Sequence, residues 1–198
     1  AKPTLLQVLY PALFFMFIWL MVKTHAAVLK NGIALILCCI PSVLILIYQY
    51  SFTFAGNGNE NATESGMEFT FMGIWHLYTP SPLLSLILSS LFPLIIFAIS
   101  IYRKETKLSF ILAWIIYLIG FCEQAFLSET GDRARHFNFS WGFNLGLFLV
   151  WWLSAVYLVK SFRKRDKTFW ICLAVFICHC GFGIYYAYVL LKDKKTVF

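Results

Sequence analysis

Charged residues are scarce in this sequence, and their scarcity excludes an ordinary water-soluble fold. Only 13% of the 198 residues are Asp, Glu, Lys or Arg, whereas 61% are hydrophobic. Soluble domains carry about 25% charged residues. A globule with so few polar side chains could not cover its surface, so the surrounding solvent is expected to be a lipid bilayer.

Several other patterns are missing. The alternation of polar and apolar residues that marks a membrane β-barrel is absent, which leaves an all-α bundle as the structure that satisfies its backbone in lipid. No glycine-rich phosphate loop or serine nucleophile motif occurs, and no cleavable signal peptide is expected, since the first apolar run is long enough to span. The six cysteines all fall inside apolar runs and predict no disulfide framework.

The sequence predicts a polytopic integral membrane protein with six transmembrane helices and short loops. A membrane-spanning helix needs about 20 apolar residues. We expect one transmembrane domain over residues 1–198, with spans at about 5–22, 33–50, 83–102, 108–127, 141–159 and 168–191. Between the second and third spans, "MEFTFMGIWHLY" (67–78) is expected to form a short amphipathic helix at the membrane interface.

Basic residues gather at one end of these spans. Ten of the sixteen Lys and Arg residues lie between spans 1–2, 3–4 and 5–6, and six lie on the other side. Because Lys and Arg are enriched in cytoplasmic loops, we expect both termini outside the cytoplasm, in a plasma (inner) membrane. The basic tail "KDKK" argues against this orientation. The same distribution explains the net charge of +7 without nucleic acid, which is not an expected partner.

Prolines occur inside the first three spans, at Pro11, Pro41 and Pro93, and are absent from the last three. A proline removes one helix hydrogen bond and kinks the helix. Two interpretations follow. These helices could hinge or line a cavity, or they could tolerate proline because neighbouring helices bond the freed carbonyl group.

Polar chemistry concentrates in "GFCEQAFLSETGDRARHFNFSWGFN", residues 120–144, between two apolar runs. Glu123 is about four residues, or roughly 6 Å, inside the end of the fourth span. A carboxylate at that depth is costly and marks a candidate functional site. Arg133 and Arg135, on the connection that follows, are the expected partners of Glu123.

We predict that this stretch forms a polar cap over a cavity between the fourth and fifth spans. Because an arginine fork suits carboxylate and phosphate groups, anionic ligands or lipid head groups are the expected ligands. Trp151 shares a helical face with Asn144 and would add an aromatic wall. The predicted ligand-binding residues are Glu123, Gln124, Arg133, Arg135, His136, Asn138, Asn144 and Trp151.

Three functions remain open from the sequence. The protein could bind or transport a ligand or lipid, or assemble as a subunit of a larger complex; its expected partners are then membrane lipids, other subunits or a second copy. It could be a membrane enzyme for a lipid or lipid-linked substrate, with acid–base chemistry from Glu123, Glu129, Arg133, Arg135 and His136. It could be a structural or regulatory subunit, in which the charges fix a helical hairpin.

Two further motifs occur in the sequence. "CHC" at 178–180 has a spacing that points the two thiols of a helix apart, so we expect no metal and no cofactor. Asn61 and Asn138 each begin an Asn-x-Ser/Thr sequon, which would favour an outward-facing loop if either carried a glycan.

Overall fold

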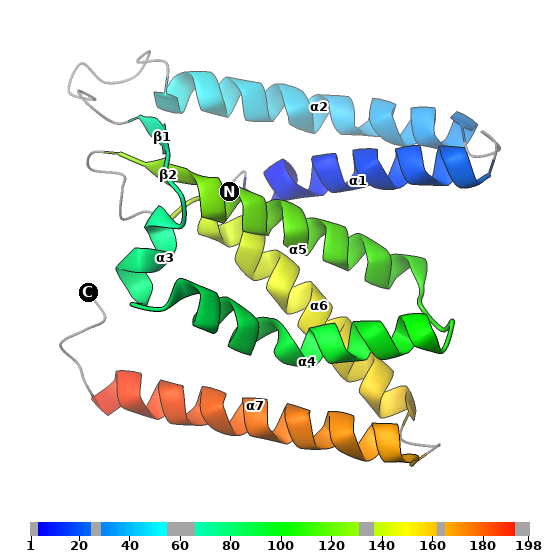
Figure 1. Ribbon diagram of the computed structural model, residues 1–198. Coiled ribbons are helices and arrows are strands. Elements are labelled where there is room, and N and C mark those ends of the chain that lie inside the picture. Colours follow the sequence, from blue (N-terminus) through cyan, green and yellow to red (C-terminus); the bar gives the residue numbers. More distant parts are fainter. Residues whose placement is uncertain (1–3, 25–28, 55–65, 131–136, 162–164, 193–198) are drawn as a thin grey trace. The chain divides into compact units, whose positions relative to one another are not determined.

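Six long helices dominate the structure, which is a computed structural model (Figure 1). It describes residues 4–24, 29–54, 66–130, 137–161 and 165–192. The elements in chain order are α1 (Thr4–Lys23), α2 (Leu29–Phe54), β1 (Met67–Phe69), α3 (Gly73–Tyr78), α4 (Pro82–Tyr102), α5 (Leu108–Phe126), β2 (Leu127–Glu129), α6 (Ser140–Ser161) and α7 (Lys167–Lys192).

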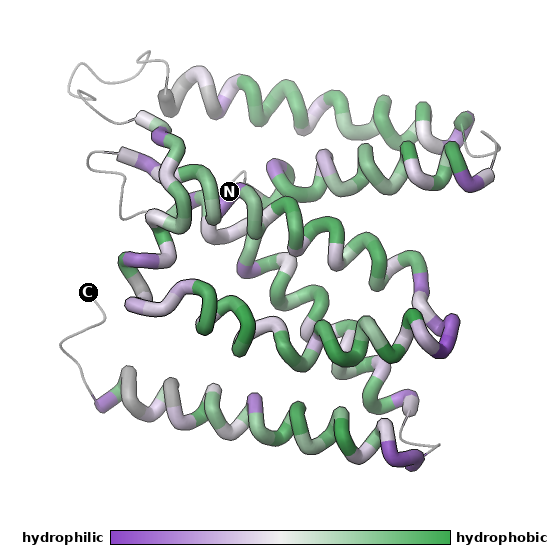
Figure 2. The backbone as a smooth tube through the Cα atoms, viewed as in Figure 1, coloured by the Kyte–Doolittle hydropathy of each residue, from purple (hydrophilic) through white to green (hydrophobic). Residues whose placement is uncertain are grey.

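All six long helices have the length and composition of membrane spans, which confirms the predicted helical bundle with six spans. Figure 2 shows hydrophobic residues along these helices and hydrophilic residues mostly near their ends. The observed bounds lie close to the predicted ones, although α2 begins four residues earlier than expected, at Leu29. The fold therefore indicates an integral membrane protein.

The chain divides into two compact units. The first comprises residues 1–80 and 111–148, and the second comprises residues 81–110 and 149–198. Because α5 and α6 each belong partly to both units, this division does not test the expected single transmembrane domain, which stays a prediction.

In the first unit, glycines allow the backbones of α5 and α6 to touch. A Cβ atom at Gly120 would lie 2.5 Å from the backbone of Gly142 and Phe143, and one at Gly146 would lie 2.5 Å from Cα of Tyr117. Gly142 and Gly146 are one helical turn apart, the small-xxx-small spacing that favours close helix packing in membranes. These contacts fix the antiparallel register of the two helices.

A small β-structure covers the end of α5. Met67 pairs with Glu129 and Phe69 with Leu127 in the antiparallel pair β1–β2. The amide groups of Thr70 and Met72 then donate to the carbonyl groups of Phe126 and Ala125, at distances of 3.1 and 2.7 Å. Carbonyl groups in the last turn of a helix have no partner inside the helix, so the chain after β1 acts as the cap of α5. We call residues 67–72 and 127–129 the β-cap.

This arrangement corrects the helix expected over residues 67–78. Only Gly73–Tyr78 is helical, and Met67–Phe69 forms a strand. The sequence "MEFTF" alternates apolar and polar residues, which is the period of a strand and not of a helix. In α3, the buried Trp75 packs on the rings of Phe121 and Phe143 and so attaches the cap to the helices.

In the second unit, polar contacts join the residues that follow α4 to the end of α6 and the start of α7. Arg103 forms an ion pair with Asp166, and the hydroxyl group of Tyr157 donates to Glu105 at 2.7 Å. Asp166 also accepts a hydrogen bond from the amide of Phe169 and so caps the start of α7. Burial lowers the pKa of Arg103, but Asp166 and Tyr157 outweigh it and the net pKa is raised, so Arg103 stays charged.

Candidate functional site

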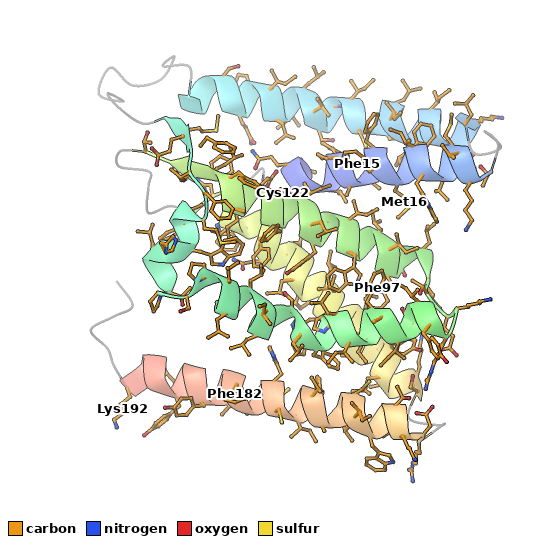
Figure 3. The ribbon with its side chains drawn as sticks, viewed as in Figure 1. Phe15, Met16, Phe97, Cys122, Phe182 and Lys192 are labelled. Carbon is orange, nitrogen blue, oxygen red and sulfur yellow. The ribbon has the colours of Figure 1, made fainter. Side chains whose placement is uncertain are left out.

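Glu123 lies on a groove between α1 and α5 in the first unit. The groove has a volume of about 590 Å³ and is open along one side. Apart from Glu123 its lining is apolar: Pro11, Phe15, Ile115, Leu118, Ile119, Cys122, Phe126 and Leu127. Figure 3 labels one lining residue from each helix, Phe15 on α1 and Cys122 on α5. Both side chains are exposed, so the groove is open to the surroundings of the two helices.

The carboxylate of Glu123 reaches from this groove toward α6. Its Oε2 atom is buried and has no hydrogen-bond partner among the described residues. A Cβ atom at Gly142 would lie 3.0 Å from Oε2 and 2.4 Å from Cγ1 of Val8. Glu123 therefore sits where α1, α5 and α6 meet, and the missing side chain at Gly142 provides the space for its carboxylate.

Three other buried polar atoms that have no hydrogen-bond partner within the described ranges occur at the ends of the same three helices. They are Oε1 of Gln7, Oε1 of Gln124 and Oγ of Ser140. Gln7 is in the first turn of α1, Gln124 is in the last turn of α5, and Ser140 is the first residue of α6. Buried polar groups normally have partners, so unsatisfied atoms gathered at one end indicate a site for a ligand.

The helix register places Gln124 opposite the region of Ser140. Gly120 faces Gly142, and Gly146 faces Tyr117. In an antiparallel pair, one turn toward the end of α5 corresponds to one turn toward the start of α6. Gln124, four residues after Gly120, thus faces the region of Ser140. We call Gln7, Glu123, Gln124 and Ser140 the acceptor cluster.

Not all of the predicted site residues join this cluster. Arg133, Arg135 and His136 lie outside the described residues, so their pairing with Glu123 and their proposed roles stay predictions. Asn144 is exposed on the face of α6 that points away from Gly142 and Gly146. It does not line the junction of α1, α5 and α6.

Glu129 and Asn138 form a separate pair. Nδ2 of Asn138 donates to both carboxylate oxygens of the buried Glu129, at 2.8 and 2.9 Å. This bond closes the connection from β2 to α6. It also occupies the nitrogen that a glycan would modify in the sequon Asn138–Ser140, and Ser140 itself is buried. The Asn61 sequon lies outside the described residues.

Trp151 belongs to the second unit, where it repairs the break that Pro93 makes in α4. Pro93 has no N–H group to donate to the carbonyl oxygen of Ser89, four residues earlier. The indole Nε1 of Trp151 donates to that oxygen at 2.8 Å. The ring of His179 packs on Trp151 in a tilted arrangement, with ring centroids 4.1 Å apart. For Pro93, the structure therefore supports the interpretation in which neighbouring helices bond the freed carbonyl.

No group of three or more His, Cys, Asp and Glu residues in the described part of the chain has an arrangement that could hold a metal ion. Comparison with family models, with curated proteins and with solved structures finds no match for this chain. The acceptor cluster and the groove are therefore the features of this chain that bear on its function.

Proposed function

We propose that the protein binds an amphipathic molecule in the α1–α5 groove, with a cationic or hydrogen-bond-donating head group on Glu123. The observation that supports this proposal is the half-buried side chain of Glu123 in an otherwise apolar groove. Its Oε2 atom has no hydrogen-bond partner among the described residues. A carboxylate inside the membrane is costly unless it is paired. A long-chain ammonium group supplies both the charge and the apolar contact.

Membrane lipids and lipid-like amines are the proposed source of this ligand, because the groove opens along exposed residues of α1 and α5. The proposal places the protein among membrane proteins for ligand binding, alone or as a subunit that presents a ligand to a partner. It differs from the anionic ligand that the sequence favours, since that expectation depends on Arg133 and Arg135. Enzymatic acid–base chemistry gains no support from Glu129, whose two oxygens are bound by Asn138.

The test is photo-crosslinking with a long-chain primary amine that carries a diazirine, added to the purified protein in nanodiscs. Peptides from α1 and α5 are expected to be labelled. Glu123→Gln should reduce labelling at least about tenfold, because a charged hydrogen bond contributes about 1.5–3 kcal/mol and 1.4 kcal/mol corresponds to a factor of ten. Glu68→Gln is the matched control, because Glu68 accepts its hydrogen bond from Ser128 in the β-cap.

Equal labelling of the wild-type protein and Glu123→Gln would overturn the proposal. A matched long-chain fatty acid that labels more strongly than the amine would also overturn it, since a carboxylate head group would be repelled by Glu123. Thermal unfolding of both variants in the same nanodiscs separates lost binding from lost folding.

We also propose that the end carrying β1, β2 and α3 faces away from the cytoplasm, in a plasma (inner) membrane. The support is the excess of Lys and Arg at the opposite ends of the helices. In a background without native cysteines, a membrane-impermeant maleimide should label Gly58→Cys in intact cells and should leave Phe162→Cys unlabelled until the cells are opened. The reverse labelling would invert the orientation.

A further inference from the structure

We infer that the acceptor cluster is a binding site for a monovalent metal cation, with Na⁺ as the ion that its chemistry fits. The proposed ligands are Oε1 of Gln7, Oε2 of Glu123, Oε1 of Gln124 and Oγ of Ser140. This inference goes beyond the proposed function, because the cation needs none of the apolar groove.

The chemical type of the unpartnered atoms is the first argument. One carboxylate oxygen, two amide oxygens and one hydroxyl oxygen are hard oxygen ligands, the type that alkali and alkaline-earth ions prefer over nitrogen or sulfur. Gln124 and Ser140 are only 4% and 5% exposed. Buried oxygens that accept no hydrogen bond from the described residues are expected to have another partner.

A fifth oxygen arises at Pro11 inside α1. Pro11 has no N–H group, so the backbone carbonyl group of Gln7, four residues earlier, lacks its helical donor. In membrane transporters, interrupted helices present such carbonyl oxygens to Na⁺ near the site of the coupled substrate. Gln7 thus offers both a side-chain and a backbone oxygen at the end of α1 that meets Glu123.

The charge of the cluster selects a monovalent ion. Glu123 is its one acidic member, so a single positive charge neutralises it, whereas a divalent ion would leave a net positive charge in the bilayer. Among the described residues of the first unit, the Lys side chains are Lys23 and Lys30, at the other end of α1 and α2. Lys23 is 16 residues from Gln7, or about 24 Å along the helix, so it cannot supply this charge.

Cation binding and groove binding share Glu123 but no other residue. Neutralisation of Glu123 by Na⁺ would remove the charge that attracts an ammonium head group. Na⁺ is therefore expected to compete with the amine of the proposed function. The two sites can be separated by substitution, because Gln124 and Ser140 do not line the groove, and Phe15 lines the groove but is not part of the cluster.

The experiment is thermal unfolding of the purified protein in nanodiscs, with NaCl replacing KCl at constant ionic strength and constant pH. Binding to the folded state alone raises the Tm as the ligand concentration exceeds the Kd. We expect a rise that grows with the logarithm of the Na⁺ concentration above the Kd and reaches about 5–11 °C near one hundred times the Kd, given the entropy of unfolding of a chain of this length. Phe15→Trp, which fills the groove, should keep this rise and lose amine labelling.

Gln124→Leu and Ser140→Ala should each reduce the Na⁺-dependent rise at least twofold while they keep amine labelling in Na⁺-free buffer. If one of them fails to fold, the other provides the test. Absence of amine labelling in the wild-type protein, together with an intact Na⁺ response, would overturn only the proposed function.

Equal Tm values in NaCl and KCl would overturn the cation site, and so would a rise that survives in the Gln124→Leu, Ser140→Ala double variant. A Tm that depends on pH and not on Na⁺ would assign the site to a proton instead. A Na⁺ response that appears only when Arg133 and Arg135 are both replaced by Ala would show that an arginine occupies the site in the native protein.

Discussion

Replacement of Gly146 by leucine is expected to prevent α5 and α6 from packing and to destabilise the protein by at least about 3 kcal/mol, the upper end of the usual cost of overpacking. The added Cβ atom would lie 2.5 Å from Cα and 2.7 Å from the amide nitrogen of Tyr117. These are backbone atoms, so no rotamer change can relieve the clash. The helices would have to separate along their length.

Thermal unfolding in detergent micelles or nanodiscs, together with size-exclusion chromatography, measures this effect. Gly181→Leu in α7 is the matched control, because a Cβ atom at Gly181 has no atom within 4 Å. Glycine is a poor helix former, so the control should unfold at the same temperature as the native protein or slightly higher. Equal Tm values for the two leucine variants would refute the close contact of α5 and α6.

Trp151→Phe is expected to cost about 1–3 kcal/mol, the usual penalty for leaving a buried carbonyl group without a donor. Phenylalanine keeps an aromatic ring near Phe92, whose centroid lies 4.7 Å from that of Trp151. It removes the indole N–H group that donates to Ser89. Trp152→Phe is the control, because Trp152 is 60% exposed.

A double-mutant cycle with Pro93→Ala assigns this cost to its cause. Alanine at position 93 restores an N–H group that can donate to Ser89 within α4. In that background Trp151→Phe should therefore lower the Tm less than it does in the native protein. An equal loss in both backgrounds would show that Trp151 stabilises the protein through packing and not through this hydrogen bond.

The six spans could be predicted from the sequence because they depend on a bulk property. A run of about 20 apolar residues has one stable solution in a bilayer, a helix whose backbone groups bond each other. The missing helix hydrogen bond in α4 could also be predicted, because a proline such as Pro93 lacks an N–H group in any context. The group that replaces this N–H as donor to the carbonyl oxygen of Ser89 could not be predicted. It belongs to Trp151, which is 62 residues away, and only the tertiary fold brings it close.

The site was only partly predictable. Glu123 could be predicted as a site residue because a carboxylate is rare inside an apolar run. Gln124 could be predicted as its neighbour in the sequence. Gln7 and Ser140 were missed, because a single glutamine near a terminus and a serine at the start of a span are common. The signal that could have located them is the glycine spacing at 142 and 146, which brings α5 and α6 together and so sets Gln124 against the region of Ser140.

The β-cap shows a different limit. The alternation in "MEFTF" is a strand signal. However, the strand that forms there has only three residues, Met67–Phe69, which are too few to outweigh the helical pattern of the residues that follow. Its partner, β2, follows α5 without a break and contains the polar residues Ser128 and Glu129, so it resembled the rim of a site more than a strand. The pairing depends on a contact across about 60 residues of sequence.

That separation has a consequence for biosynthesis. Strand β1 and the buried Trp75 are made well before β2 and Phe143, the residues that cover them. At about 5–20 residues per second, translation of the intervening 60 residues takes roughly 3–12 s. During this interval the unpaired edge of β1 is open to incorrect pairing, so a pause or truncation before residue 127 would release a nascent chain prone to aggregation at the membrane surface.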